Sequence, residues 1–181
     1  MFSRSAVLVV SLLAAFAAVS ADAKVFYSRN EALELAFPDA EEVASNTFIL
    51  DDEQVARIES LAKCDLDSKL VKIYTGKRDG KVIGYALIDI HNVRTLPEAF
   101  MVVLNPEGEV RSLRVLAFHE PLEYKPTNRW YQQFDNRSIE APLRVGGDIH
   151  GVVGATLSTR ATTRGVRRAL AYYEVLLQSK E

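Results

Sequence analysis

Three side-chain hydroxyls lie close together near the C-terminal end of the sequence, on Thr156, Ser158 and Thr159. Two small residues, Gly154 and Ala155, come directly before them and leave the backbone open to close approach. A helical pattern begins at the same place. The first turn of such a helix offers unpaired backbone N–H groups and the positive end of the helix dipole. The segment therefore has the chemistry of a phosphate-binding site.

Arginines follow these hydroxyls at the spacing of one helical face, at Arg160, Arg164 and Arg167. They would form a basic stripe that leads away from the phosphate site. The spacing is also compatible with a plain structural role, in which Ser158 or Thr159 caps the helix and the arginines face solvent. The phosphate-binding sequences Gly-x-x-x-x-Gly-Lys and Gly-x-Gly-x-x-Gly are absent. The local pattern leaves both interpretations open.

The element that must position this segment is a long C-terminal helix, which we expect from about Ser158 to Gln178. Its apolar residues recur at the spacing of a single buried face. They are Val166, Ala169, Leu170, Tyr173 and Leu177.

Two shorter helices are predicted in the first third of the chain. Ser28 and Glu31 fit a capping box, and the helix that they start should end before Pro38. Asp51 with Gln54 marks the start of a second helix. A third short helix is expected over 127–134, followed by an irregular stretch over 136–147.

The middle of the chain has the alternation typical of strands. Residues 70–74 and 82–90 flank a polar turn, and this pair predicts a β-hairpin. Residues 100–104 and 110–118 flank Asn105-Pro106-Glu107-Gly108, which is a turn sequence, and predict a second hairpin. The expected fold class is α+β, with an antiparallel β-sheet, helices packed against it and the long C-terminal helix.

The N-terminal residues and the net charge indicate where the protein is located and which partners it is unsuited to. Arg4, a short apolar run over 6–19 and Ala21-Asp22-Ala23 are typical of a secretory signal peptide, so we expect 1–23 to be cleaved and 24–181 to form a single domain. An uncleaved membrane anchor is the alternative. The chain has 181 residues and a net charge of −2, which does not favour binding to nucleic acid.

The segment around Thr156 resembles the end of the bacterial FMN-binding domain family. The residues that carry the resemblance are Asp148-Ile149 and the run over 154–161, with Phe118-His119-Glu120-Pro121 and 130–134 upstream. The family includes subunits of the Rnf electron-transport complex and of the sodium-translocating NADH:quinone reductase. In the family, a flavin transferase esterifies the threonine of Gly-Ala-Thr through the phosphate of FMN.

The resemblance implies that Thr156 carries the flavin phosphate. It also implies a set of cofactor-binding residues around it: Gly154, Ala155, Leu157, Ser158, Thr159, Glu120 and Val153. The family target has Asp six residues before the threonine and Ser or Thr three before it, whereas this sequence has His150 and Val153 there.

The function implied by the resemblance is that of an exported FMN-binding electron carrier, periplasmic or at the outer face of the inner membrane. Its partners would be membrane-bound or periplasmic redox proteins and a flavin transferase. The alternative is a cofactor-free envelope sensor or assembly module of the same fold. A small flavin-dependent reductase ranks last, because no set of catalytic acid, base, nucleophile or metal ligands is predicted.

Overall fold

The computed structural model describes residues 24–178, so the predicted signal peptide over 1–23 lies outside the described residues. The described residues form a six-stranded sheet with the strand order β1-β6-β5-β4-β3-β2, in which every neighbouring pair is antiparallel. The strands are β1 (Lys24–Val25), β2 (Glu42–Ile49), β3 (Leu70–Arg78), β4 (Lys81–Asn92), β5 (Pro97–Leu104) and β6 (Val110–Phe118). The α-helices are α1 (Arg29–Ala36), α2 (Asp52–Ala62), α3 (Asn128–Tyr131) and α4 (Thr156–Leu176).

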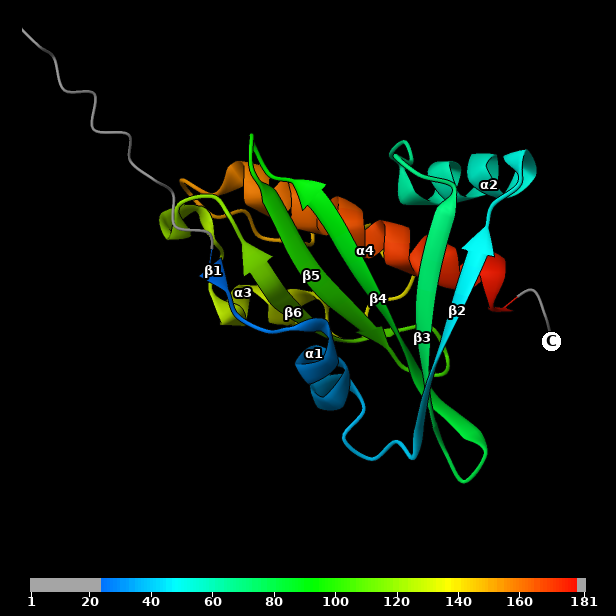
Figure 1. The fold of residues 1–181 in the computed structure, drawn as a ribbon. Helices are drawn as coiled ribbons and strands as arrows, with labels where there is room; N and C mark the ends of the chain where they lie inside the picture. Colours follow the sequence, from blue (N-terminus) through cyan, green and yellow to red (C-terminus); the bar gives the residue numbers. More distant parts are fainter. Residues whose placement is uncertain (1–23, 179–181) are drawn as a thin grey trace, which may run out of the picture.

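Helices cover both faces of the sheet, with α1 on one face and α2, α3 and α4 on the other (Figure 1). β5 shows why both faces are apolar. Phe100 and Val102 pack into the core on the α4 side, whereas Met101 and Val103 pack into the core on the α1 side. The predicted α+β class, with its antiparallel sheet and long C-terminal helix, is confirmed.

Both predicted hairpins are present, as β3–β4 and β5–β6. In the second turn, the N–H of Glu109 donates to the Asn105 side chain over 2.8 Å. The edge strand β2 was not predicted. Most of its side chains are exposed on both faces, so its sequence lacks the alternation that identifies a half-buried strand.

The first two helices begin where their capping residues predict. The N–H of Ser28 donates to the Glu31 carboxylate over 2.7 Å, and the N–H of Glu31 donates back to the Ser28 hydroxyl. The N–H of Gln54 donates to Asp51 over 2.8 Å in the same arrangement. The third helix is α3, which continues as a 3₁₀ turn over Gln132–Phe134.

The helix α4 begins at Thr156, two residues earlier than the sequence predicts, and ends at Leu176. Its N-cap is Ala155, which makes no side-chain capping bond. The capping role considered for Ser158 and Thr159 is therefore wrong. Both residues lie inside the first turn, and their side chains are buried.

The helix α4 lies very close to the sheet at Gly165. A Cβ atom at this position would be 2.5 Å from the ring of Phe100 and 2.9 Å from the Asp89 carboxylate. Only glycine lets the helix approach β4 and β5 this closely. The close approach at Gly165 packs α4, whose first residue is Thr156, against β4 and β5.

No helix within residues 24–178 is long and apolar enough to cross a lipid bilayer.

Candidate functional site

A cleft of about 200 Å³ lies at the N-terminal end of α4. Most of the site residues predicted from sequence meet here, although they come from separate segments. The lining consists of Val93, Arg94, Glu120, Tyr124, Gly154, Ala155, Thr156, Leu157 and Ser158. Thr159 and Val153 are not among the lining residues. The side chain of Thr159 is fully buried, and Val153 is fully exposed beside the cleft.

The three hydroxyls that the sequence groups together have different surroundings. Thr156 is the first residue of α4, and it is exposed. The hydroxyl of Ser158 is buried and donates to the carbonyl of Tyr124 over 2.5 Å. The hydroxyl of Thr159 donates to the carbonyl of Thr156 over 2.9 Å. Thr156 is thus the one hydroxyl of this group that an incoming molecule can reach.

The turn before α4 leaves backbone donors free. Gly154 has φ +84°, a left-handed conformation that side chains disfavour, and a Cβ there would meet no atom within 4 Å. Thr159 N–H donates to the Ala155 carbonyl, as the first intrahelical bond. Within residues 24–178, the N–H groups of Thr156, Leu157 and Ser158 have no hydrogen-bond acceptor. These donors point along the helix axis, where an anion is stabilised.

Glu120 anchors the loop between β4 and β5 at the cleft. One carboxylate oxygen accepts the N–H groups of Thr95 over 2.8 Å, Leu96 over 2.9 Å and Arg94 over 3.3 Å. The hydrogen bond from Thr95 and those from its neighbours outweigh the opposing effect of burial and lower the pKa of Glu120. Glu120 therefore serves the cleft through the loop that it holds in place.

That loop brings Val93 and Arg94 into the cleft, and Tyr124 joins them from the segment after β6. The sequence alone does not predict these three residues as part of the site. Val93 and Arg94 lie near Thr156 because Glu120 holds the β4–β5 loop in place. The hydrogen bonds involved join segments that are far apart in the chain. Arg94 is exposed and supplies a cation at the edge of the cleft.

The segment before the cleft is held by Trp130 and Gln133. The indole N–H of Trp130 donates to the His150 carbonyl over 2.6 Å, and the His150 N–H donates to the Gln133 side chain over 2.7 Å. The side chains of His150 and Val153 are exposed. Both positions at which this sequence departs from the pattern of the resembled family therefore lie on the surface, in the segment that precedes Thr156.

Two of the predicted basic residues, Arg160 and Arg164, are exposed along α4, but Arg167 is not. The predicted solvated stripe is therefore wrong for Arg167. Its guanidinium is buried and donates to the carbonyls of Leu61, Ala62 and Pro142, at 2.9, 3.1 and 2.7 Å respectively.

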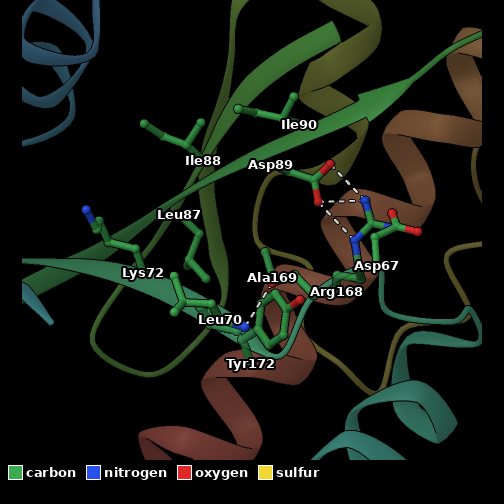
Figure 2. A pocket seen from close by; sticks show the side chains of 12 residues that line it. Asp67, Leu70, Lys72, Leu87, Ile88, Asp89, Ile90, Arg168, Ala169 and Tyr172 are labelled. Atoms are coloured by element: carbon green, nitrogen blue, oxygen red, sulfur yellow. Dashed lines mark hydrogen bonds and ion pairs between the residues drawn. The ribbon is translucent and has the colours of Figure 1, made fainter. Parts of the chain in front are cut away.

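A second group of charged side chains lies deeper in the molecule. Arg168 of α4 reaches Asp89 of β4 and bonds both carboxylate oxygens, at 2.7 and 2.8 Å (Figure 2). They border a separate hollow of about 150 Å³, which shares no lining residue with the Thr156 cleft. Asp89 also binds His91, whose ring contacts Glu98 on its other side.

Known proteins resemble this chain in sequence and in fold. It is 23% identical over 141 residues to a subunit of the Na⁺-translocating ferredoxin:NAD⁺ oxidoreductase complex of Acetobacterium woodii, a match covering 68% of this chain and 65% of that protein. It is 32% identical over 117 residues to a subunit of the ion-translocating oxidoreductase complex of Haemophilus influenzae, a match covering 54% of each. The chain thus spans between half and two thirds of these relatives. No protein-family model matches it.

Among solved structures, NqrC of Shewanella oneidensis has a similar fold. The TM-score is 0.53 at 14% sequence identity, and the match covers 82% of this chain and 87% of NqrC. The sequence relatives and this fold confirm the resemblance predicted from the segment around Thr156.

Proposed function

We propose that this chain, a relative of subunits of ion-translocating oxidoreductase complexes, is an exported electron-transfer protein that carries FMN at Thr156. In this proposal residues 1–23 are a signal peptide, 24–181 form a single FMN-binding domain, and a flavin transferase attaches the cofactor. FMN would supply one- and two-electron transfer, and the protein would bind, orient and retain it.

The observation that carries the proposal is the accessible hydroxyl of Thr156 at an uncapped helix start. Unbonded N–H groups of the first turn lie beside it, and Arg94 lies at the edge of the same cleft. A phosphate ester on this hydroxyl would find backbone donors, the positive end of the α4 dipole and a cation. Ser158 and Thr159 have the same chemistry but are buried and bonded elsewhere.

The small size of the cleft supports a covalent attachment. A volume of about 200 Å³ is below the roughly 300–1,000 Å³ of ordinary ligand pockets. It suits a phosphate and its neighbouring carbons, but it buries too little surface to retain a whole flavin by contacts alone. A bond to Thr156 would keep the cofactor in place outside the cytoplasm.

The apolar side chains next to Thr156 are suited to the flavin ring. Leu157 follows Thr156 directly and is half exposed, and Val93 faces it from the β4–β5 loop. Contact with these side chains would shield part of the ring from water. The exposed position of Leu157 would leave an edge of the ring open to membrane-bound or periplasmic redox partners.

The test is the intact mass of the mature protein after coexpression with a flavin transferase. We expect a yellow protein whose mass increases by that of FMN minus water, and Thr156→Val should abolish the increase. The matched control is Thr47→Val, which removes an exposed hydroxyl on β2 and should keep the increase. A colourless protein with unmodified Thr156 and no affinity for added FMN would contradict the proposal.

The same mass measurement tests whether the two departures from the family pattern limit the attachment of flavin. Both His150 and Val153 are exposed, so His150→Asp with Val153→Ser can restore the pattern without disturbing the core. We expect this double variant to increase the flavinylated fraction over the unchanged protein at the same transferase level. An equal or smaller fraction would show that these positions do not limit the transfer.

A further inference from the structure

A second hollow adjoins the Thr156 cleft along the side of α4. This groove has a volume of about 490 Å³ and shares Val93 and Leu157 with the cleft. Its walls are the C-terminal end of α2, the segment 142–145 and the first half of α4. The two hollows therefore meet at the exposed side chain of Leu157.

The charge of the groove is entirely positive. The described residues that line it include no aspartate or glutamate, although the whole chain has a net charge of −2. Its basic residues are Lys63, Arg144, Arg160, Arg164 and Arg167. Such a concentration of one sign on an otherwise acidic chain produces a local field that attracts anionic groups.

Within residues 24–178, Arg167 is the one basic residue of the groove whose side chain forms hydrogen bonds. Arg167 is buried and binds carbonyls of α2 and of the segment 142–145, so it joins the walls of the groove. The other four are exposed, and none forms an ion pair within residues 24–178. One nearby carboxylate, that of Asp148, accepts the N–H groups of Leu143 and Arg144, and Asp65 and Asp67 line a separate hollow that Arg164 also lines. The four exposed cations therefore remain available to a partner.

The groove also has apolar lining residues, among them Val93, Leu143, Val145 and Leu157. Apolar side chains accompanied by a polar rim are typical of protein–protein contacts. A small inorganic anion would gain nothing from the apolar side chains, whereas a peptide segment with an apolar side chain of its own would bury them. The groove thus favours a protein segment.

We infer that this groove docks an acidic segment of the redox partner, with an apolar side chain of that segment seated against Leu157. The identity of the partner as a redox protein rests on the proposed function, because a partner docked here would lie next to the flavin at Thr156. Opposite charges on the two surfaces would accelerate their encounter and orient the partner.

The binding itself can be measured without flavin, which separates this inference from the proposed function. The probe is a short peptide of glutamates with one leucine and one phenylalanine, added to isotope-labelled mature chain with and without FMN. We expect amide chemical shifts to change at Leu143, Leu157 and Arg164 in both forms. Binding should weaken by at least about fivefold between roughly 20 and 300 mM salt, because salt screens exposed charges.

A charge-reversal pair gives the matched comparison. Arg144→Glu with Arg164→Glu alters two exposed cations of the groove, and we expect at least about tenfold weaker binding of the peptide. The control is Arg78→Glu with Lys81→Glu, which makes the same change of net charge on exposed residues. That hairpin tip lies at the opposite end of the sheet from the start of α4 (Figure 1). The control should bind within about twofold of the unchanged protein.

Three outcomes would overturn the inference. One is a peptide that causes no shifts in the groove, and another is equal binding of the same peptide with lysines in place of glutamates. The third is binding to vesicles of phosphatidylglycerol that displaces the peptide from the groove, which would assign the surface to a membrane. Circular dichroism of each variant establishes that lost binding does not reflect lost folding.

Discussion

The side chains of Asp89, His91 and Glu98 form a buried chain of hydrogen bonds between β4 and β5. The imidazole of His91 lies 2.6 Å from Asp89 and 3.2 Å from Glu98. Burial of the ring lowers its pKa, but the two carboxylates outweigh burial, so the pKa of His91 is raised. Arg168 bonds Asp89 from α4. His91 thus lies between two carboxylates, one of which Arg168 also bonds.

This arrangement predicts a stability that depends on pH. Because the folded state raises the pKa of His91, its stabilisation is complete below pH about 6.5 and is lost as pH rises through the folded pKa. We expect the free energy of unfolding to fall as pH rises above neutral, measured by urea denaturation at a series of pH values. The variant His91→Gln should lose this dependence, while His150→Gln, an exposed control, should retain it. An unchanged pH dependence in His91→Gln would contradict the assignment.

The sequence groups three hydroxyls at the start of α4 but does not predict that their surroundings differ. Thr156, Ser158 and Thr159 have equivalent hydroxyls in the sequence, and only the docking of α4 against the segment around Tyr124 separates them. Glu120 was predicted as a cofactor-binding residue because of a resemblance. Its bonds to the 94–96 backbone depend on a loop that no local pattern could place.

At the scale of elements, α4 joins the parts of the fold that surround the groove. The predicted apolar stripe is confirmed at Val166, Ala169 and Leu170, which are buried. The buried surface of α4 is nevertheless wider than one stripe, because both the sheet and α2 pack against this helix. The periodicity of α4 does not reveal this second partner, which is why the predicted solvent-exposed position of Arg167 is wrong.

We predict that Arg167→Met destabilises the fold substantially. The methionine can fill part of the space, but the carbonyls of Leu61, Ala62 and Pro142 lose their donors. A buried acceptor without a partner costs about 1–3 kcal/mol, so the free energy of unfolding should fall by roughly 2–4 kcal/mol in urea denaturation. Arg164→Met removes an exposed arginine one turn earlier and should change it by less than about 0.5 kcal/mol. Equal effects of the two substitutions would show that the buried bonds add nothing.

At the scale of the whole molecule, one sheet separates two hydrophobic cores. The alternation of the middle strands predicts the two hairpins, but it could not predict that β2 and β1 complete the sheet at opposite edges. β1 pairs with β6 through only two residues, and β2 is exposed on both faces. Whether such a strand pairs depends on which edge of the sheet the helices leave uncovered. That is determined by the whole fold and not by the sequence of the strand.

The shared sheet predicts that the two cores unfold together. Met101 is fully buried on the α1 side, whereas Trp130, the sole tryptophan, reports on the α4 side. Met101→Ala should lower the free energy of unfolding by about 2–5 kcal/mol, because it leaves a cavity in a packed core.

In a cooperative domain, tryptophan fluorescence and far-ultraviolet circular dichroism then shift to the same lower urea midpoint. The control Ile49→Ala alters a side chain that is 79% exposed and should leave both midpoints nearly unchanged. A Met101→Ala protein whose circular dichroism midpoint falls while its fluorescence midpoint stays would show that the α1 side unfolds alone. The coincidence of the two signals is expected because every strand between β3 and β6 supplies side chains to both cores, so neither core can lose its packing while the sheet stays intact.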